Sequence, residues 1–335
     1  MATFTPLRTD NRLAVRVFSV DKVADGVLAL ELRPLNEAAL PTFTAGAHIE
    51  IELPIQRLNM EPVVRQYSLC NDPAENHRYV IAVGRDTQSR GGSQWIHEHL
   101  QPGDRLSIRT PRNHFQLNET APHSILIAGG IGVTPLLAMA RRLSALKRPW
   151  TFFYCARSPQ RAAFLDELHK LPGTVVTFFD GVPGGARIDL AEVVANAPPE
   201  AHLYCCGPSS LIEVFERASC CLPKQRVHIE WFKPRASTSA STLPSSDGEF
   251  ELTLAKTGLR LKVPADKTIL EVLIDAGISV QHSCCDGVCG TCETRVLEGQ
   301  PDHRDCVLFG DDARCTDRLM VCVSRSAGPR LTLDL

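Results

Sequence analysis

The sequence predicts a multidomain protein in which an antiparallel β-barrel, a doubly wound α/β domain and a small α+β domain follow one another. Three observations carry this prediction. Short β-rich runs separated by turns fill roughly the first third of the chain, and a regular alternation of strands and helices follows. A last segment carries four spaced cysteines behind a Ser/Thr/Pro-rich stretch. The 335 residues are enough for two or three domains.

The composition is that of a folded protein without nucleic-acid or membrane character. Apolar residues make up 44% of the chain and charged residues 22%. The net charge of −2 gives no signal for nucleic acid, no run approaches the roughly 18 apolar residues of a membrane span, and the N-terminus lacks the apolar core of a signal peptide. We therefore expect a cytoplasmic protein whose thirteen cysteines serve metal ligation more than disulfides.

Residues 1–117 are predicted to form the barrel. β-Branched and aromatic residues alternate with polar ones in short runs, and turns such as Pro102-Gly103-Asp104 separate these runs. One helix is expected at 94–99. The predicted strands are 13–20, 27–33, 48–53, 79–83 and 105–109.

Residues 118–233 are predicted to form the α/β domain. A short apolar strand at 124–128 leads through a glycine turn into a helix at 136–146, and the alternation then repeats. This pattern is typical of a doubly wound parallel sheet. The further predicted strands are 150–155, 175–179 and 203–205, and the further helices are 162–168, 189–195 and 210–217.

Residues 234–248 are rich in Ser, Thr and Pro and are predicted to be a linker. Residues 249–335 form the third predicted domain, with a hairpin at 250–254 and 259–263, a helix at 269–276 and a last strand at 320–323. This domain has 14 acids and 10 bases, a net charge of −4, so the rest of the chain carries +2. Such a surface is by default a solvated face, and steering of a partner is the alternative.

Four cysteines of the third domain have the spacing of ligands to a metal cluster. Cys284, Cys289 and Cys292 lie in one loop as C-x4-C-x2-C, and Cys322 follows at a distance in an apolar strand. This is the ligand spacing of plant-type [2Fe–2S] proteins, and two glycines allow the loop to close around a cluster. A zinc site or buried free thiols are the alternatives.

Other polar residues near this loop are expected to play lesser parts. Cys285 breaks the spacing, and Cys306 or Cys315 would be the fourth ligand only if Cys322 were not. His282, His303 and Asp305 flank the region as ordinary surface groups or as residues that dock a partner.

Two segments of the α/β domain form a candidate dinucleotide site. Gly129–Pro135 is a strand–turn–helix whose amides suit a pyrophosphate, although a tight turn alone explains such a motif about equally well. Cys206–Pro208 ends a later strand of the same sheet, where doubly wound folds bind ligands. Arg157, Ser158 and Arg161 would lie near a ribose. Two arginines suit a 2′-phosphate, and a solvated helix start is the alternative.

Two segments of the barrel offer groups that suit a flavin and its phosphate. Arg65–Leu69 reads Arg-Gln-Tyr-Ser-Leu and supplies a guanidinium, an aromatic ring and a hydroxyl. Ser89–Ser93 reads Ser-Arg-Gly-Gly-Ser and opens a helix, so amides, a hydroxyl and an arginine meet at one place. Taken singly, the first is an ordinary strand and the second an ordinary helix start. In Glu230-Trp231-Phe232, the aromatics would either stack on a flavin, with Phe232 favoured over Trp231, or pack in the core.

These motifs, in this order, resemble the phthalate dioxygenase reductase family, which includes the reductases of vanillate O-demethylase and related Rieske aromatic oxygenases. The resemblance covers nearly the whole chain and also rests on Met-Val-Cys-Val-Ser-Arg near the C-terminus. It implies a ferredoxin-reductase-type flavin barrel, an NAD domain and a plant-type ferredoxin domain. This chain departs from the family at Cys285, where the family tends to have an acidic or polar residue, and at the doubled Cys205-Cys206.

The resemblance also implies the cofactors FMN, NADH and a [2Fe–2S] cluster. Relatives that bind FAD usually place the ferredoxin at the other end of the chain, which favours FMN. The implied flavin residues are Arg65, Gln66, Tyr67, Ser68, Leu69, Ala82, Val83, Arg90, Gly91, Gly92, Ser93 and Phe232. The implied NADH residues are Gly130, Gly132, Val133, Thr134, Pro135, Arg157, Ser158, Cys206, Gly207 and Pro208, and the implied ligands are Cys284, Cys289, Cys292 and Cys322.

Together these parts predict a relay of electron carriers. NADH delivers two electrons as a hydride, a [2Fe–2S] cluster accepts one, and a flavin bridges the difference. We expect a monomeric oxidoreductase, with no general acid or base residue, that serves the Rieske centre of a separate oxygenase. The alternatives are a stand-alone reductase for another acceptor, a methane-monooxygenase-type reductase, whose ferredoxin generally comes first, and an iron–sulfur electron carrier or sensor. The nicotinamide motifs argue against the carrier.

Overall fold

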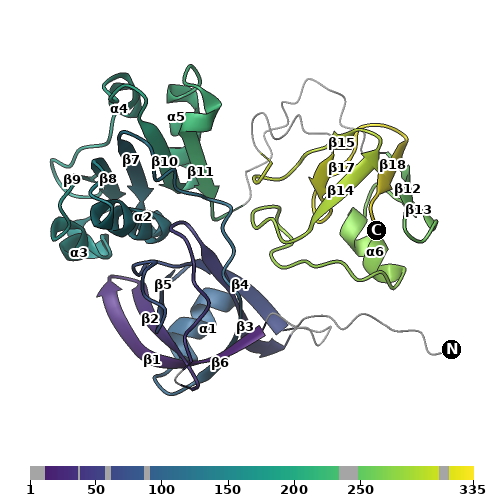
Figure 1. Ribbon diagram of the computed structural model, residues 1–335, viewed down its shortest axis with the longest axis horizontal. Coiled ribbons are helices and arrows are strands. Elements are labelled where there is room, and N and C mark those ends of the chain that lie inside the picture. The colour runs from purple at the N-terminus through teal and green to yellow at the C-terminus, as the bar shows by residue number, and fades with distance from the viewer. Residues whose placement is uncertain (1–11, 37, 57–61, 87–90, 234–247, 309–316) are drawn as a thin grey trace.

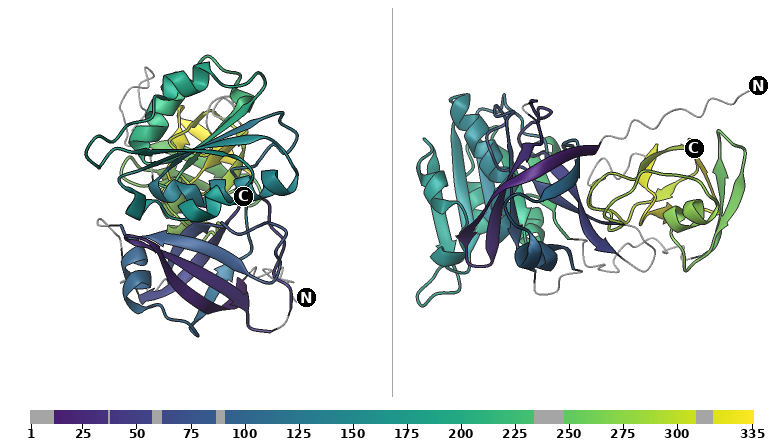
Figure 2. Two further views of the ribbon diagram at one scale, coloured as in Figure 1. Left: turned by 90° about the vertical axis from the view of Figure 1, so that its left-hand side faces the viewer. Right: turned by 90° about the horizontal axis from the view of Figure 1, so that it is seen from below.

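The computed structural model describes residues 12–36, 38–56, 62–86, 91–233, 248–308 and 317–335. They form a barrel domain, an α/β domain and a C-terminal domain, and the C-terminal domain lies beside the other two (Figures 1 and 2). Arg90 and residues 234–247 of the predicted linker fall outside the described residues. Within the described ranges, no helix is long and apolar enough to cross a membrane.

The barrel domain is a closed antiparallel sheet, as predicted. Its strand order is β4-β3-β6-β1-β2-β5, and a bridge between Leu69 and Ile81 joins the end of β4 to β5. Ile49, Ile51 and Leu53 are almost fully buried because alternate side chains of β3 point inward. Helix α1 (Gly92–His99) packs on this core. The strands are β1 (Arg12–Ala24), β2 (Val27–Pro34), β3 (His48–Gln56), β4 (Pro62–Ser68), β5 (Tyr79–Gly84) and β6 (Arg105–Arg109).

The α/β domain is a five-stranded parallel sheet in the order β11-β10-β7-β8-β9, with helices on both faces (Figure 2). The chain leaves β7 toward β8 and later returns to β10 on the other side of β7, which makes β7/β10 the switch point where such sheets bind ligands. The strands are β7 (Ser124–Gly129), β8 (Trp150–Ala156), β9 (Thr174–Phe179), β10 (His202–Gly207) and β11 (Val227–Trp231), and the helices are α2 (Val133–Ala145), α3 (Leu165–His169), α4 (Leu190–Ala195) and α5 (Ser209–Ala218).

The C-terminal domain has a sheet in the order β13-β12-β18-β14-β16 and one helix, α6 (Ile269–Asp275). Thr268 and Glu271 cap α6 reciprocally, and the Arg325 guanidinium donates to the carbonyls of Lys267, Pro264 and Gly248. The strands are β12 (Phe250–Leu254), β13 (Arg260–Val263), β14 (Glu293–Glu298), β15 (Pro301–Asp302), β16 (Arg318–Met320), β17 (Arg325–Ser326) and β18 (Arg330–Leu333).

The predicted last strand at 320–323 is wrong. Strand β16 ends at Met320, and Cys322 lies in the turn that follows it. Leu319, Met320 and Val321 are all fully buried, so the apolar run marks core packing and not an extended strand. Two further strands, β17 and β18, follow this turn.

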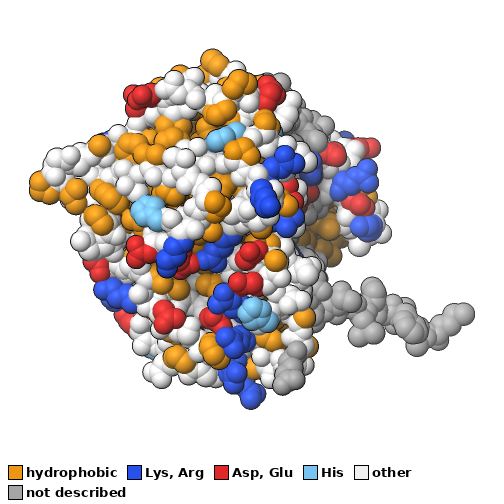
Figure 3. Space-filling model, turned by 60° about the vertical axis from the view of Figure 1, so that its left-hand side comes forward, with side chains coloured by type: hydrophobic (Ala, Val, Ile, Leu, Met, Phe, Trp, Pro, Cys, Tyr) orange, Lys and Arg blue, Asp and Glu red, His pale blue; other side chains and the backbone are white. Residues whose placement is uncertain are grey.

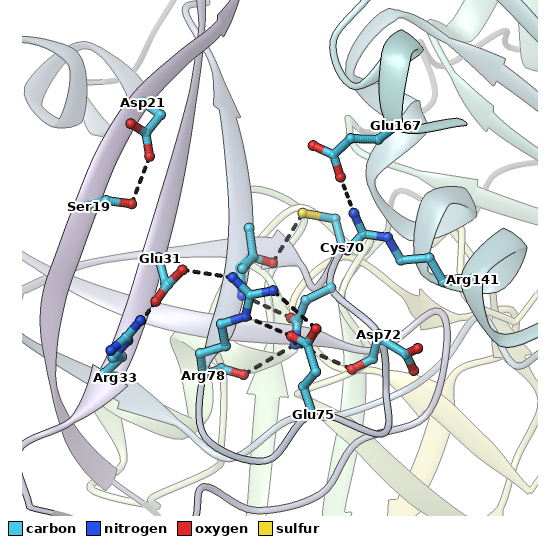
Figure 4. A network of polar contacts seen from close by, with 12 residues as sticks. Ser19, Asp21, Glu31, Arg33, Cys70, Asp72, Glu75, Arg78, Arg141 and Glu167 are labelled. Atoms are coloured by element: carbon cyan, nitrogen blue, oxygen red, sulfur yellow. Dashed lines mark hydrogen bonds and ion pairs between the residues drawn. The ribbon is translucent and has the colours of Figure 1, made fainter. Parts of the chain in front are cut away.

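Ion pairs support the barrel where it approaches helix α2 (Figure 4). Arg78 donates to Glu31 at 2.8 Å and to Glu75 at 2.7 Å, which ties β2 to the segment before β5. Nearby, Arg141 of α2 pairs with Glu167 of α3. On the face shown in Figure 3, basic and acidic side chains are mixed over the barrel domain, and neither sign dominates.

Candidate functional site

The two candidate flavin segments lie side by side in the barrel domain. A Cβ atom at Gly92 would lie 2.7 Å from Nε of Arg65, so glycine is needed for Arg65 to cross the start of α1. Gly91 has a φ of 95°, which is favourable only for glycine. The hydroxyl of Ser93 accepts from the amide of Asp86 at 3.3 Å. Guanidinium, hydroxyl and helix-start amides therefore meet at one place, and this donor set fits a phosphate.

The other predicted flavin residues differ in what they expose. Leu69, Ala82 and Val83 are buried, so only their backbone is available to a ligand. Tyr67 is half-buried, and burial raises the pKa of its phenol, so the ring stays neutral. The Gln66 amide donates to Glu50 of the neighbouring strand at 3.2 Å. A neutral ring beside main-chain groups fits an isoalloxazine edge.

The two candidate dinucleotide segments pack directly on each other at the switch point of the sheet. A Cβ atom at Gly132 would lie 2.1 Å from the carbonyl oxygen of Cys206, and one at Gly129 would lie 2.5 Å from Cδ of Pro208. Backbone meets backbone at Gly132, which therefore requires glycine, and the ring of Pro208 leaves no room for a side chain at Gly129. Gly130, with a φ of 53°, has open space beside its Cα.

The residues after this turn mainly support it. Val133 and Pro135 are buried, and the Thr134 hydroxyl donates to the carbonyl of Ile131 at 3.0 Å. Thr134 therefore holds the turn in shape. Ile131 also reaches the barrel domain, since a Cβ atom at Gly84 would lie 3.6 Å from its side chain.

A cavity of about 520 Å³ opens at the carboxyl ends of β7, β8, β9 and β10. Gly129, Gly130 and Pro208 line one side of it, and Arg157 and Asp180 line another. Asp180 accepts from Arg157 at 3.4 Å and from Arg187 at 3.1 Å. The cavity thus joins the predicted pyrophosphate turn to a charged end that suits a ribose.

Glu230 is a site residue that the sequence reasoning missed. It pairs in register with Cys206 on β10, its carboxyl accepts from the Cys206 thiol at 3.9 Å, and it hydrogen-bonds Ser68 of the flavin segment. Burial raises the pKa of this carboxyl to about 8. A lone acid at the end of an apolar strand was the available signal. Ser68, Cys206 and Glu230 form the junction between the barrel and α/β domains.

The two aromatic residues after Glu230 have different surroundings. Trp231 is 5% exposed and belongs to the core of the α/β domain, whereas Phe232 is 37% exposed. Lys233 pairs with Asp86 of the barrel domain at 2.9 Å. Phe232 therefore lies between the junction and the segment that precedes α1, where its ring is open to a ligand.

The four predicted cluster ligands come together. The Cys284 thiol lies within hydrogen-bonding reach of Cys289 and Cys322, and Cys292 lies within reach of Cys322. Among the described residues, no three His, Cys, Asp or Glu side chains surround a single-ion site. All four thiols thus lie in one connected group, which supplies the four cysteine ligands that a [2Fe–2S] cluster would take.

The surroundings of these sulfurs also fit an iron–sulfur cluster. The amide of Asp286 donates to the sulfur of Cys284 at 3.3 Å, and the amide of Thr291 donates to that of Cys289 at 3.4 Å. Amide donors stabilise anionic sulfur ligands. Cys285 is exposed with a φ of 55°.

Several residues in and beside the cysteine loop, residues 284–292, are held by contacts within the protein. The Asp305 side chain is fully buried and accepts from the amides of Val307 and Leu308, so it is not a surface group. Val288 and Cys306 pack against the apolar core of the α/β domain. Cys315 lies outside the described residues.

Comparisons with known proteins agree with this division into sites. Residues 126–217 match the family described as oxidoreductase NAD-binding domain, and residues 252–326 match the 2Fe-2S iron-sulfur cluster binding domain. The chain is 45% identical to phenoxybenzoate dioxygenase subunit beta of Ectopseudomonas oleovorans over 323 residues, covering 96% of this chain and 97% of the relative.

Two further proteins are similar over nearly all of this chain. Phthalate dioxygenase reductase of Burkholderia cepacia is 38% identical and is covered in full. A solved structure of phthalate dioxygenase reductase has a TM-score of 0.68 at 38% identity, covering 97% of this chain and 98% of that one. An intact type IV self-sufficient cytochrome P450 monooxygenase has a TM-score of 0.86 at 34% identity, and the match covers 99% of this chain and 43% of that chain.

Proposed function

The chain belongs to the family of oxygenase reductase subunits that includes phthalate dioxygenase reductase, and we propose that it passes electrons from NADH through FMN and a [2Fe–2S] cluster to the Rieske centre of a separate aromatic oxygenase. One observation carries the proposal. The junction of Ser68, Cys206 and Glu230 joins the flavin segment to the nicotinamide segment, and Glu50 beside that flavin segment also contacts the cysteine loop through Thr291.

The residues of the chain bind and orient the carriers. A bound flavin would take a hydride and release electrons singly, and a [2Fe–2S] cluster would accept them one at a time. Arg65 and the start of α1 would hold the flavin phosphate, and Ser68 would lie beside the reacting edge of the ring. Cys206 and Glu230 would close the other side, where they keep water from the junction.

Within this proposal the donor is NADH. Arg157 and Arg187 both pair with Asp180, so the charge that would attract a 2′-phosphate is partly neutralised. The flavin is FMN, by the resemblance of the domain order to reductases in which the ferredoxin comes last. The protein acts as a monomer, because one chain supplies all three sites.

The relatives' names support an oxygenase as the partner. Phenoxybenzoate dioxygenase subunit beta and phthalate dioxygenase reductase are both named for dioxygenase systems. A second candidate acceptor is a haem oxygenase, since the similar self-sufficient P450 carries a matching segment over 43% of its own chain. Co-purification with an iron oxygenase, and the metal centre of that oxygenase, distinguishes the two.

The proposal is tested first on the purified protein. We expect flavin absorption bands together with the brown visible absorption of a [2Fe–2S] cluster, and heat-released flavin that chromatographs as FMN. NADH added without oxygen should bleach both chromophores, and NADPH should do so with a much higher KM. Flavin bands without cluster absorption would contradict the proposed relay, and released FAD would contradict only the FMN assignment.

The order of carriers is tested by Cys292→Ser. This change removes one predicted ligand, so the reduction of cytochrome c, a one-electron acceptor, should fall by at least ~100-fold. The rate at which NADH bleaches the flavin should stay within about two-fold, because the junction is untouched. The matched control is Cys285→Ser in the same loop, which should retain both activities. Unchanged cytochrome c reduction in Cys292→Ser would show that electrons leave from the flavin.

A further inference from the structure

One face of strand β3 carries polar side chains, and the C-terminal domain contacts one of them, Glu50. Ile49, Ile51 and Leu53 fill the barrel, so the alternating residues His48, Glu50 and Glu52 point outward. An outward-facing carboxylate would normally lie in water, yet Glu50 is only 2% exposed. The structure therefore buries this carboxylate at a boundary between domains.

Glu50 contacts three residues from three different elements. One carboxylate oxygen accepts from the hydroxyl of Thr291 at 2.8 Å and from the amide of Gln66 at 3.2 Å. The other oxygen pairs with Arg109 of β6 at 3.1 Å. The pair with Arg109 compensates the buried charge. Glu50 thus links the flavin-segment strand β4 directly to the cysteine loop.

Thr291 has a second partner within its own loop. Its hydroxyl oxygen lies 3.2 Å from the sulfur of Cys289, and its side chain is buried. A hydroxyl has one hydrogen to donate, so it donates to the carboxylate or to the sulfur. Donation to an ionised carboxylate gives the stronger bond, and the sulfur of a cluster ligand shares its charge with iron. In the docked arrangement, the Thr291 hydroxyl therefore donates its hydrogen bond to the Glu50 carboxylate and not to the sulfur of Cys289.

We propose that Glu50 is a positioning residue for electron transfer: it holds the cysteine loop against the flavin strand through Thr291, and it keeps the hydrogen of Thr291 away from the sulfur of Cys289. The inference rests on the proposed function, in which Cys289 is a cluster ligand. Two neighbouring contacts support the same docked arrangement. His114 lies against Gly290, and Arg112 donates to Gln281 at 3.2 Å.

The proposal makes the cluster potential depend on docking. Hydrogen bonds to the sulfurs of an iron–sulfur cluster raise its reduction potential. While the Thr291 hydroxyl donates to Glu50, Cys289 keeps the amide bond from Thr291 but receives none from the hydroxyl. When the C-terminal domain leaves the barrel, the hydroxyl is free to turn to the sulfur, and the potential rises.

The test is a set of four holoproteins: wild type, Thr291→Val, Glu50→Gln and the double variant. The midpoint potential of the cluster is measured in each by redox titration followed by electron paramagnetic resonance. Thr291→Val should leave the potential of the wild type unchanged, because the hydroxyl does not donate to sulfur there. In the Glu50→Gln background, Thr291→Val should lower the potential. There the neutral amide no longer outcompetes the sulfur for the hydrogen bond of the Thr291 hydroxyl, so the valine removes a hydrogen bond to Cys289. An equal effect in both backgrounds, including no effect in either, would overturn the proposal.

Two controls separate the hydrogen bond from simpler causes. Glu52→Gln removes one negative charge from the same face of β3, where Glu52 pairs with Arg12 at 3.0 Å, and Thr291→Val should have no effect on the potential in that background. Thr291→Ser keeps the hydroxyl and should match the wild type.

A second readout follows electron transfer itself. In stopped-flow experiments, Glu50→Gln and Thr291→Val should slow reduction of the cluster by the flavin several-fold, while the bleaching of the flavin by NADH stays unchanged. Unslowed cluster reduction in both variants would contradict the positioning role. A protein that shows no cluster signal in any variant would contradict the proposed function, whereas a normal signal with equal effects would contradict only the role of Glu50.

Discussion

At the scale of single residues, Glu230 shows how folding creates a functional group from an ordinary acid. The sequence places it between an apolar strand and two aromatic residues. Only the parallel pairing of β10 with β11 brings it beside Cys206, and only the packing of the two domains brings it to Ser68. Burial at this junction favours the neutral carboxyl, which gives the folded protein a carboxyl that titrates near pH 8.

Glu230→Gln should change how stability depends on pH. The pKa of Glu230 is about 8 in the folded protein and near 4.5 in the unfolded chain, so the folded state binds its proton more tightly. Stability from this group is fully present below pH 4.5 and is lost as the pH rises through 8, by at most about 1.4 kcal/mol per pH unit. The thermal midpoint of the variant minus that of the wild type should therefore increase from pH 5 to 8 and then stay constant.

The control for this titration is Glu192→Gln, which changes an exposed acid of the same domain. Its thermal midpoint should differ from that of the wild type by a constant amount across the range. Calorimetric scans of both variants at pH 5, 6, 7, 8 and 9 decide the matter. Parallel curves for Glu230→Gln and the wild type would show that this carboxyl is already ionised at neutral pH.

Asp180 offers a second prediction at this scale. Asp180→Asn removes the negative charge that Arg157 and Arg187 share, and so frees two cations beside the ribose end of the cavity. The KM for NADPH should fall about ten-fold, which corresponds to roughly 1.4 kcal/mol of binding energy, while the KM for NADH changes little. Steady-state kinetics with both donors measure this, with Asp166→Asn on α3 as a control. An unchanged KM for NADPH would show that the 2′-phosphate does not bind beside Arg157 and Arg187.

At the scale of elements, the glycine turn before α2 depends on a second strand for its shape. Gly132 lies against the backbone of Cys206, so neither segment can move without the other. Gly132→Ala would place a methyl group 2.1 Å from that carbonyl oxygen. We expect a loss of about 2–4 kcal/mol in stability of the α/β domain and a raised KM for NADH, measured by calorimetry and kinetics.

Gly328→Ala is the matched control for this substitution, because nothing lies within 4 Å of the added methyl group. It should leave both the thermal midpoint and the KM close to those of the wild type. If Gly132→Ala behaved like Gly328→Ala, the close packing of the two dinucleotide segments would not matter for binding.

The elements that the sequence predicts well are those whose side chains alternate with a clear period. Strands β1, β2, β3 and β6 follow such patterns, because one face of each is more buried than the other. The fold class and the cluster spacing were predictable for the same reason: both are local patterns. The position of Cys322 was not, because an apolar run reads alike whether it forms a strand or a buried turn.

The missed parts of the site depend on contacts between distant segments. Glu50 and Glu230 look like ordinary acids in the sequence, and Thr291 looks like a spacer between two cysteines. Their roles come from contacts between segments that lie up to 241 residues apart. Periodicity carries no information about such contacts, so only the three-dimensional structure reveals them.

At the scale of the whole molecule, the cysteine loop faces inward. Gly290 and Thr291 lie against the barrel domain, and Val288 packs on the α/β domain. This arrangement suits the arrival of electrons from the flavin, because the loop contacts the domain that holds the flavin segment. It leaves Cys285 as an exposed part of the loop, so a partner either docks at that edge or meets the domain after it has moved.

Shortening the predicted linker within residues 236–246, which lie outside the described residues, distinguishes these two routes. If the C-terminal domain must leave the barrel to deliver electrons, a deletion of several residues should slow cytochrome c reduction several-fold, since the shorter tether limits the reach of the domain. Bleaching of the flavin and of the cluster by NADH should remain as in the wild type, because the docked arrangement is intact. A Gly/Ser replacement of equal length is the control and should retain full activity. Full cytochrome c reduction by the shortened protein would instead place the exit at the exposed edge around Cys285, and the loop would then accept and deliver electrons without moving.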